Sequence, residues 1–525
     1  MDIDKENIKN SFKEEFKFQT KKQISAKKFN IDKEFSYLNL KLKSDYEKNP
    51  VVYIMLIDPN NKLRVQYRSI YSKNNIIVGQ DRSKCSIGTY PGIINSGEWK
   101  LIIISLENNK EDSEYSVVIK CTNNEVENED FDKIDEDMWV EYNNENGNLL
   151  ELTNYDWNKN FNIEKRWYKG DFNTHSTISD GKMDSKLYMQ VTKEMNLDFA
   201  VPTEHNIIPT AWKKDNEILI IPGTEVTMID GHFNIIGVRR FPFNLNIERL
   251  LEDYNNKNFH DIQENIVRKI VYDEQDNRAI YSINHMVLEF WKWKFLNIEL
   301  DKFNTIEICN DPTYYLGAES NDKVIKMLDI LWNDGHRIYG IGGSDAHILP
   351  TETYDNSNER SIMGDPGTFV YCDKLTANNV IKSVKQGHVY VSRGILLNIY
   401  IRIKGRECAY LPGDEIEVDD YAEINYSIDI KLENLINEYG SINKTEMPLK
   451  VYFIENGVRT ERIISTEGRL DFNSNWNKDD FKYLSVEVRD MNDNFKAYIN
   501  PIYHGSKEHE IITFKDLFEK YNEEL

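Results

Sequence analysis

Residues 170–181 of the chain, GDFNTHSTISDG, gather carboxylate and imidazole side chains within a short stretch that has the composition of a turn. Aromatic residues precede the stretch and Gly181 closes it, which indicates a strand that ends in a loop. Side chains two residues apart on a strand project to the same side, so Asn173 and His175 would face one site. Taken alone, the stretch is equally well interpreted as a polar surface loop.

Other histidines and acids occupy a similar place in the pattern, because each adjoins a short apolar run typical of a buried strand. The runs are LDFAVP, EILIIPG, FNIIGV, YSIN and RIYGIGG, and beside them lie His205, Glu225, His232, His285, Asp345 and His347. In a parallel barrel the carboxyl ends of the strands share one mouth, so these side chains would converge there. Imidazoles and carboxylates that converge in one pocket bind borderline or hard divalent cations. The sequence therefore predicts a metal site.

The pattern between residues 164 and 394 alternates strands with helices. Asp184 is expected to cap one helix, and a later helix is expected to begin at Asp322 and to end at Gly335. Repeated strand–helix units over about 230 residues fit a closed parallel barrel. We therefore expect an α/β fold with the metal site at the carboxyl ends of its strands.

Two-residue periodicity on either side of this region indicates two β-sandwich domains, at residues 23–121 and 395–505. The charged residues 1–22 predict a loose or peripheral helical tail, and residues 506–525 predict an amphipathic helix docked on the body. The acidic residues 122–163 predict a solvated linker. A calcium site is an alternative there, although the spacing does not match an EF-hand loop.

Composition limits the class of protein. The chain has 525 residues, a net charge of −23 and 40% hydrophobic residues, which favours sizeable cores and argues against nucleic acid as a partner. The five cysteines are odd in number and form no CxxC pair, which favours a reduced, cytoplasmic location. No signal peptide and no apolar run of about 20 residues is visible, so we expect no membrane partner. The oligomeric state is left open.

The order GDFNTHSTISDG, TEHN, PGTEVT with GHFNIIG, NHM and GGSDAH resembles the PHP superfamily, named after polymerase and histidinol phosphatase domains. The PGxE, GH and GSDAH forms are similar, more narrowly, to those of the CehA/McbA-like metallohydrolases. The resemblance covers about residues 164–394 and implies a distorted (β/α)7 barrel that holds two or three zinc, manganese or iron ions. It also implies hydrolysis of a phosphoester or a related ester by water that the metals activate.

Carried over position by position, the resemblance implies three metal positions. The first would be held by His175, Glu225 and Asp345, the second by Glu225 as a bridge with His232 and His285, and the third by His205 and His347 with Asp180. Asn173 stands where the family has a histidine, so one metal would lose an imidazole ligand. We expect catalysis to depend most on Glu225, Asp345 and His205.

Arginines and a tryptophan near the predicted mouth are the candidates for substrate binding. Arg239, Arg240 and Arg393 would meet an anionic substrate, with ion pairs inside the rim as an equal alternative. Trp291 would form a wall of the pocket, with core packing as its alternative role. We therefore expect a small-molecule phosphoester as the substrate.

Three other functions are alternatives to a phosphoesterase. The same fold would also suit a carboxylic or carbamic ester hydrolase. A metal-binding protein with a decayed site, acting as a binding module, is favoured by Asn173 alone. A serine hydrolase that uses Ser176 or Ser344 lacks the sharp strand-to-helix turn that such a nucleophile needs.

Overall fold

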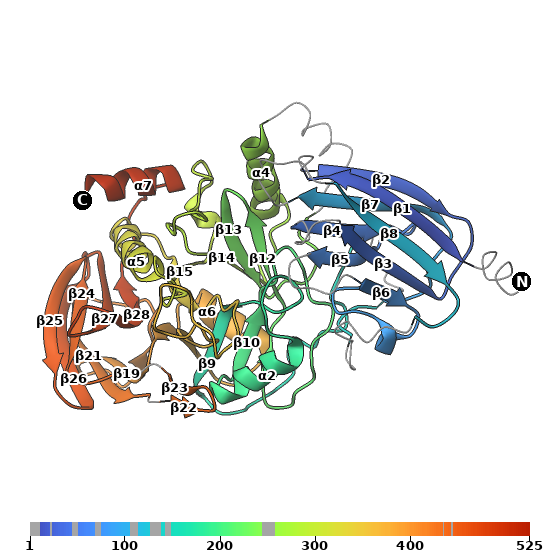
Figure 1. Ribbon diagram of the computed structural model, residues 1–525. Helices are drawn as coiled ribbons and strands as arrows, with labels where there is room; N and C mark the ends of the chain where they lie inside the picture. Colours follow the sequence, from blue (N-terminus) through green and yellow to red (C-terminus); the bar gives the residue numbers. More distant parts are fainter. Residues whose placement is uncertain are drawn as a thin grey trace, which may run out of the picture.

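The computed structural model arranges the chain as three strand-rich parts, running from the N-terminal strands through a central α/β part to the C-terminal strands (Figure 1). The residues it describes are 11–20, 24–44, 51–68, 75–105, 114–126, 138–141, 149–243, 258–433, 435–442 and 445–524. Residues 1–10 of the predicted tail and 127–137 of the predicted linker lie outside them. No helix in the described stretches is both long and apolar enough to cross a membrane.

Two antiparallel sheets form the N-terminal part, as the alternating sequence predicts. One sheet has the order β1 (Phe12–Gln19), β8 (Glu114–Thr122), β3 (Tyr37–Ser44) and β6 (Asn75–Gly79). The other has the order β2 (Ile24–Ile31), β7 (Gly97–Ser105), β4 (Val52–Ile57) and β5 (Leu63–Arg68). Leu40, Ile54 and Trp99 are completely buried in the core that the two sheets share.

The predicted helical tail is wrong where the structure describes it, because residues 12–19 form strand β1. In the sequence FKEEFKFQ, Phe16 and Phe18 are buried and their charged neighbours are exposed. This alternation has the period of a strand, and β1 pairs antiparallel with β8 along its whole length.

The central part is built on two sheets. The nine-stranded sheet has the order β11 (Leu219–Ile220), β10 (Phe199–Pro202), β9 (Arg166–Thr174), β17 (Gly367–Cys372), β18 (Val389–Ser392), β28 (Phe495–His504), β27 (Lys482–Asp490), β24 (Leu449–Glu455) and β25 (Val458–Ile464). The five-stranded sheet has the order β12 (Gly223–Met228), β13 (Gly231–Ile236), β14 (Ile280–Ile283), β15 (Thr305–Asn310) and β16 (Tyr339–Gly343). Isolated parallel bridges, Thr174 with Ala346 and His205 with Glu225, connect the two sheets.

The expectation that all central strands run parallel is wrong. Strands β9 and β10 are parallel, as are β14, β15 and β16, but β12, β13 and β14 pair antiparallel. Only Ile229 and Asp230 separate β12 from β13, which is enough for a hairpin and too short for a helical crossover. The fold is thus mixed α/β, and its closure into a (β/α)7 barrel stays a prediction.

The described helices lie between and beside these strands. They are α2 (Ser185–Glu194), α4 (Phe259–Arg268), α5 (Gly317–Asn333), α6 (Ala377–Lys385) and α7 (Phe514–Glu523). Asp184 caps α2 as predicted, because its side chain accepts a hydrogen bond from the Leu187 amide. The predicted start of α5 at Asp322 is wrong: the helix begins at Gly317, and Asp322 forms an ion pair of 2.7 Å with Arg489.

A third four-stranded sheet completes the C-terminal part. It has the order β20 (Ala409–Tyr410), β19 (Ile395–Ile403), β21 (Tyr421–Leu432) and β26 (Gly468–Asn477), and β22 (Leu435–Asn437) pairs with β23 (Gly440–Ile442) nearby. Its inner side chains share a core with those of β24, β27 and β28, which gives the predicted sandwich-like packing. The nine-stranded sheet crosses the predicted boundary at residue 394, because β18 pairs with β28.

Segments predicted to be peripheral are packed against the body. On α7, Phe514 is completely buried against Trp293 and Phe303, so this helix docks as predicted. In the predicted solvated linker, Met138 and Trp139 are buried and belong to the large central core. That prediction is therefore wrong for residues 138–140, 150 and 152, whose apolar side chains have a core to enter, whereas residues 123–125 and 158–160 are exposed as predicted.

Candidate metal centre

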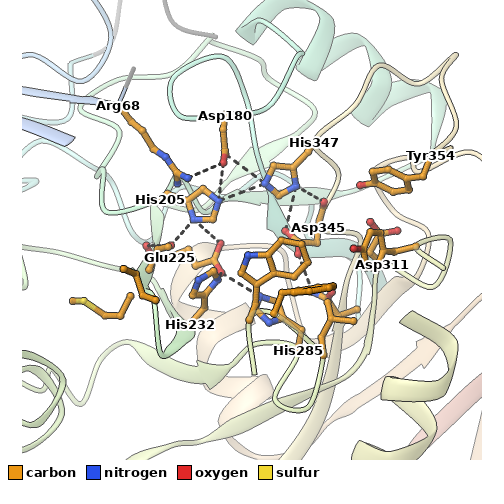
Figure 2. Close-up of a pocket in the computed structure, with 18 residues that line it drawn as sticks. Arg68, Asp180, His205, Glu225, His232, His285, Asp311, Asp345, His347 and Tyr354 are labelled. Atoms are coloured by element: carbon orange, nitrogen blue, oxygen red, sulfur yellow. Dashed lines mark hydrogen bonds and ion pairs between the residues drawn. The ribbon is translucent and has the colours of Figure 1, made fainter. Parts of the chain in front are cut away.

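A cavity of about 500 Å³ lies where the N-terminal sandwich meets the central sheets. Most of the predicted ligands line it: Asp180, His205, Glu225, His232, His285, Asp345 and His347. Figure 2 shows these side chains pointing toward one another from separate segments of the chain. Leu288, Phe290 and Trp291 form an apolar side of the same cavity.

The loop after β9 carries His175 and Asp180, and a buried glutamate holds its shape. Glu204 accepts hydrogen bonds from the backbone amides of Ser176 and Ser179 and from both of their hydroxyls. Buried polar groups need such partners, and here they fix one loop in one conformation. The loop therefore presents Asp180 to the cavity, and it holds His175, which is fully buried and outside the cavity lining, against Glu225 and Asp345.

The β12–β13 hairpin supplies Glu225 and His232. Its register places Glu225 opposite Asn234 and His232 opposite Thr227, so Glu225 and His232 lie diagonally on one face. The sequence placed Glu225 after a strand, whereas it lies inside one. Asn284 orients its carboxylate by donating a hydrogen bond of 3.0 Å to Glu225 Oε1.

Strained backbone presents two further ligands. His285 follows β14 with φ of 29°, and Asp345 follows β16 with φ of 50°, both in the left-handed region that side chains other than glycine's rarely adopt. The Asp345 amide donates to the Asn173 carbonyl over 2.9 Å, which ties the ends of β16 and β9 together. Such strain is concentrated at functional sites, where the surrounding structure maintains it.

The ligand atoms fall into three overlapping groups, each compact enough to surround one ion. The groups are His175, Glu225 and Asp345; His205, Glu225 and His232; and His175, Asp180, His205 and His347. In each group the ligand atoms lie within 4.8 Å of one another. These are close to the three sets that the resemblance implies, with His205 in place of His285 in the second and His175 added to the third. His285 Nε2 lies 3.6 Å from Glu225 Oε1.

Distances within the groups are those of ion pairs, and yet many of the atoms lack hydrogen bonds. His175 Nε2 lies 3.0 Å from Asp345 Oδ1 and 3.2 Å from Glu225 Oε2, and His232 Nδ1 lies 3.0 Å from Glu225 Oε1. Among the described residues, the buried ligand atoms without a hydrogen bond are His175 Nδ1 and Nε2, Glu225 Oε2, His232 Nδ1, His285 Nδ1 and Asp345 Oδ1. Nitrogen and oxygen atoms that gather at this range without hydrogen bonds fit a shared cation.

Neighbouring charges set the protonation of the cluster. Burial, with Arg68 adding to it, lowers the pKa of His205 to about 3, so its imidazole is neutral and able to bind a metal. Burial alone would lower the pKa of His175, but Asp345 and Glu225 raise it well above its ordinary value. Burial would likewise raise the pKa of Glu225, but the surrounding imidazoles, His205 first, hold it well below its ordinary value.

Asn173 is buried behind the cavity and does not line it. Its Oδ1 accepts a hydrogen bond of 2.7 Å from the Thr203 hydroxyl, and its side chain also meets the buried carboxyl of Glu307. A Cβ on Gly343 would lie 2.4 Å from the Asn173 Cβ, so the strands here are in close contact. The role of Asn173 as a metal ligand stays a prediction.

The arginines predicted to bind substrate are not in the cavity, which corrects that expectation. Arg239 stacks on Trp157 with 3.6 Å from its guanidinium carbon to the ring centroid, and Arg240 lies 3.4 Å from Glu274. Arg393 is bound to Asp365 at 2.7 Å. Arg240 and Arg393 form ion pairs, which is the alternative that the sequence left open, whereas Arg239 packs on an aromatic ring.

Arg68, at the end of β5, is one of the cavity residues that sequence reasoning missed, as are Asp311 and Tyr354. Its Nη2 lies 3.1 Å from Asp180 Oδ2, and Figure 2 shows it reaching toward Asp180 and His205 from the N-terminal sandwich. A signal was present, because Arg64, Gln66 and Arg68 alternate along an otherwise apolar strand and must share one face. Gln66 on that face bonds to the backbone of Ile208 in the central part.

Comparisons with known proteins add little to these observations. No protein-family model matches the chain, and no curated protein matches it. Among solved structures, it is similar to a two-domain protein from Bacteroides vulgatus described as containing a predicted PHP-like metal-dependent phosphoesterase, with 17% identity over 66% of this chain and 99% of that one and a TM-score of 0.32. A pre-peptidase C-terminal domain of a Bacillus anthracis collagenase matches 20% of this chain and 87% of its own, with 11% identity and a TM-score of 0.15. Because these scores are low, a function can be inferred only from the residues of the site.

Proposed function

We propose that the protein is a metal-dependent hydrolase of the PHP type that cleaves a small-molecule phosphoester. The observation that carries the proposal is the set of overlapping ligand groups, in which several buried donor atoms lie within reach of one another without hydrogen bonds. Burying such atoms unpaired costs free energy that a bound cation would recover. Membership of the CehA/McbA-like branch and a closed (β/α)7 barrel belong to the same proposal, supported by the sequence motifs.

Two or three zinc, manganese or iron ions fit this donor set, because imidazole nitrogen and carboxylate oxygen together suit borderline divalent cations. The ligands would be His175, Asp180, His205, Glu225, His232, His285, Asp345 and His347, with Asn173 as a weaker one. When bound, the ions supply Lewis-acid chemistry that activates water and polarises the ester. The chain itself orients the ligands, since Asn284 donates to Glu225 and the Thr227 hydroxyl contacts His205.

Arg68 favours a phosphoester over a neutral ester. Among the residues described as lining the cavity, it carries the permanent positive charge, and its side chain is only 10% exposed. A guanidinium in a partly dehydrated pocket binds phosphate oxygens through two parallel hydrogen bonds. We infer that Arg68 meets the non-bridging oxygens of the substrate beside Asp180.

A carboxylic or carbamic ester is the second candidate, and the apolar side of the cavity favours it. Phe290 is 63% exposed and Trp291 41% exposed, and with Leu288 they offer a surface for an uncharged group. A neutral ester would gain from this surface and would have no need of Arg68.

The test is elemental analysis of protein purified without added metal, followed by a panel of phosphomonoesters, phosphodiesters and neutral esters. We expect bound divalent metal and a preference for phosphate that Arg68→Met lowers by about 10- to 100-fold in kcat/KM, with partial recovery in Arg68→Lys. The matched control is Arg278→Met, which removes an arginine whose side chain is 68% exposed. Turnover of neutral esters alone would replace the phosphoester proposal by its rival, and metal without any turnover would favour the binding module.

A further inference from the structure

A carboxyl group outside the three ligand groups also lines the cavity. Asp311 follows β15 and is 6% exposed, and its backbone has φ of 27°, in the left-handed region. Its amide donates to the Gly343 carbonyl over 3.3 Å, which anchors it beside the end of β16. A buried acid on strained backbone in a cavity wall is a candidate for a functional role.

The partners of this carboxyl are hydroxyl groups. Thr313 Oγ1 donates to Asp311 Oδ1 over 2.7 Å, Ser361 Oγ lies 3.5 Å from the same oxygen, and the Tyr354 hydroxyl forms a further side-chain hydrogen bond. The charged and titratable groups that interact with Asp311 from the packed segments are Asp345, His347, Tyr314 and Tyr354. Figure 2 shows Asp311 and Tyr354 together on the side of the site away from Arg68.

This environment gives Asp311 a pKa different from those of the other acids of the cavity. Burial, reinforced by the negative charge of Asp345, raises the pKa of Asp311 to about 7, although its hydroxyl partners oppose the rise. The pKa values of Asp180 and Glu225 are held well below their ordinary values by the cations and imidazoles around them. Carboxyl groups whose pKa values are pushed apart in one site divide the work of acid and base.

The aromatic side of the cavity adjoins Asp311. The ring of Tyr314 lies 6.0 Å from that of Trp291 and 5.6 Å from that of Tyr354, centroid to centroid. A substrate whose phosphate meets Arg68 would extend its organic group toward these rings. Its leaving oxygen would then lie on the side of the cavity where Asp311 is.

We propose that Asp311 is the proton donor to the leaving oxygen and that Tyr354 positions its carboxyl group. The inference rests on the proposed function. In the step, an oxygen atom of water forms a bond to phosphorus, the bond from phosphorus to the leaving oxygen breaks, and that oxygen takes the proton of Asp311. The products are the alcohol and phosphate, and the Asp311 carboxylate regains a proton that the attacking water has lost to solvent.

The experiment compares two phosphomonoesters that differ in the basicity of the leaving group, 4-nitrophenyl phosphate and benzyl phosphate, on metal-loaded protein. A proton donor matters for the basic benzyl alkoxide and little for nitrophenolate, which leaves without a proton. We expect Asp311→Asn to lower kcat/KM for benzyl phosphate by about 10²- to 10⁴-fold and for 4-nitrophenyl phosphate by less than about fivefold. The alkaline limb of the benzyl phosphate pH profile should disappear in this variant and shift in Tyr354→Phe.

Two controls separate this role from a structural one. Asp329→Asn removes a buried carboxyl whose pKa burial also raises to about 7, but which lies on α5 near Arg459 and outside the cavity. It should leave the ratio of the two substrates unchanged. Infrared difference spectra between metal-free wild type and metal-free Asp311→Asn should contain a protonated-carboxyl band that is lost as the pH rises through about 7.

The outcomes distinguish the two proposals. If the wild type cleaves no ester with any of the three metals, the proposed function and this inference both fail. If the wild type is active but Asp311→Asn slows both substrates equally, or lowers the metal content, Asp311 is structural or a ligand and the inference alone is overturned. Absence of the infrared band in wild type near neutral pH overturns it as well.

Discussion

Two sets of buried charges in this molecule are built in opposite ways. In the N-terminal sandwich, Asp58 and Arg64 are completely buried and paired at 3.2 Å. Arg64 also donates to the carbonyls of Tyr90, Gly92 and Ile93, and Asp58 accepts from the amides of Asn60 and Lys62. In the central cavity the histidines and acids are buried or nearly so, but many of their atoms have no such bond.

The difference indicates what each set is for. A buried pair whose hydrogen-bonding groups are satisfied by the backbone is complete, and it holds one conformation of the turns around it. A buried cluster of ligand atoms that lack hydrogen bonds is complete only with a cation. Burial and charge alone do not separate these cases, whereas the hydrogen bonds do.

The largest effect is expected from Glu225→Gln, which should remove most of the bound metal and with it the activity. Glu225 belongs to two of the three groups, and the change removes the charge that both share. Mutating a residue that only hydrogen-bonds to a metal ligand typically costs about 10- to 100-fold in metal affinity. Changing the ligand itself should therefore lower the metal affinity of each of these two groups by more than that. Elemental analysis checks it, with Glu264→Gln on α4 as the control for the same chemical change outside the cavity. Unchanged metal content would mean that the ligand groups are wrongly assigned.

Arg64→Met should instead destabilise the fold and leave metal binding intact. Removing one partner leaves Asp58 charged and buried, which typically costs about 3–5 kcal/mol of unfolding free energy. Denaturant unfolding measures the loss, and the double variant with Asp58→Asn should recover part of it. A loss of metal rather than of stability in Arg64→Met would abolish the distinction between the two sets.

Asn173→His should strengthen the weakest metal position. An amide oxygen is a neutral and poorer donor than imidazole, so the ion near His175, Glu225 and Asp345 is expected to be the most loosely held. The variant should raise the metal stoichiometry and lower the metal concentration needed for activity by about tenfold, whereas Asn173→Ala should raise it. A full, chelator-resistant complement in wild type that neither change alters would remove Asn173 from the ligand set.

Metal binding should release protons and tighten as the pH rises. In the metal-free protein the pKa values of His175 and His347 are raised, by Asp345 and Glu225 for the first and by Asp180 and Asp345 for the second. Below these pKa values both rings hold protons that an ion has to displace, so affinity falls as the pH falls and levels off once both rings are neutral. The effect should be at most about tenfold per pH unit for each proton. Calorimetric metal titrations in buffers of different ionisation enthalpy count the protons, and no release near neutral pH would contradict the prediction.

The sequence predicted the members of the cluster well because ligand types and apolar runs are local signals. It could not predict that Glu225 and His232 belong to a hairpin, since a short buried strand has the same composition in either direction. Arg68 was missed because its partner Asp180 lies in another part of the fold and only tertiary packing joins them. Arg393 is the opposite case: the sequence predicts it for substrate binding, but the fold brings Asp365 beside it and the two form an ion pair.

The nine-stranded sheet has a consequence for any shortened form of the chain. Tyr390 and Val391 of β18 pair with Ile499 and Tyr498 of β28, so a chain that stops at residue 394 would carry an open sheet edge in place of that ladder. Open edges pair with the edges of other chains and cause aggregation. Residues 395–505 are therefore not a detachable module: the central part has to be expressed, transplanted or engineered together with them.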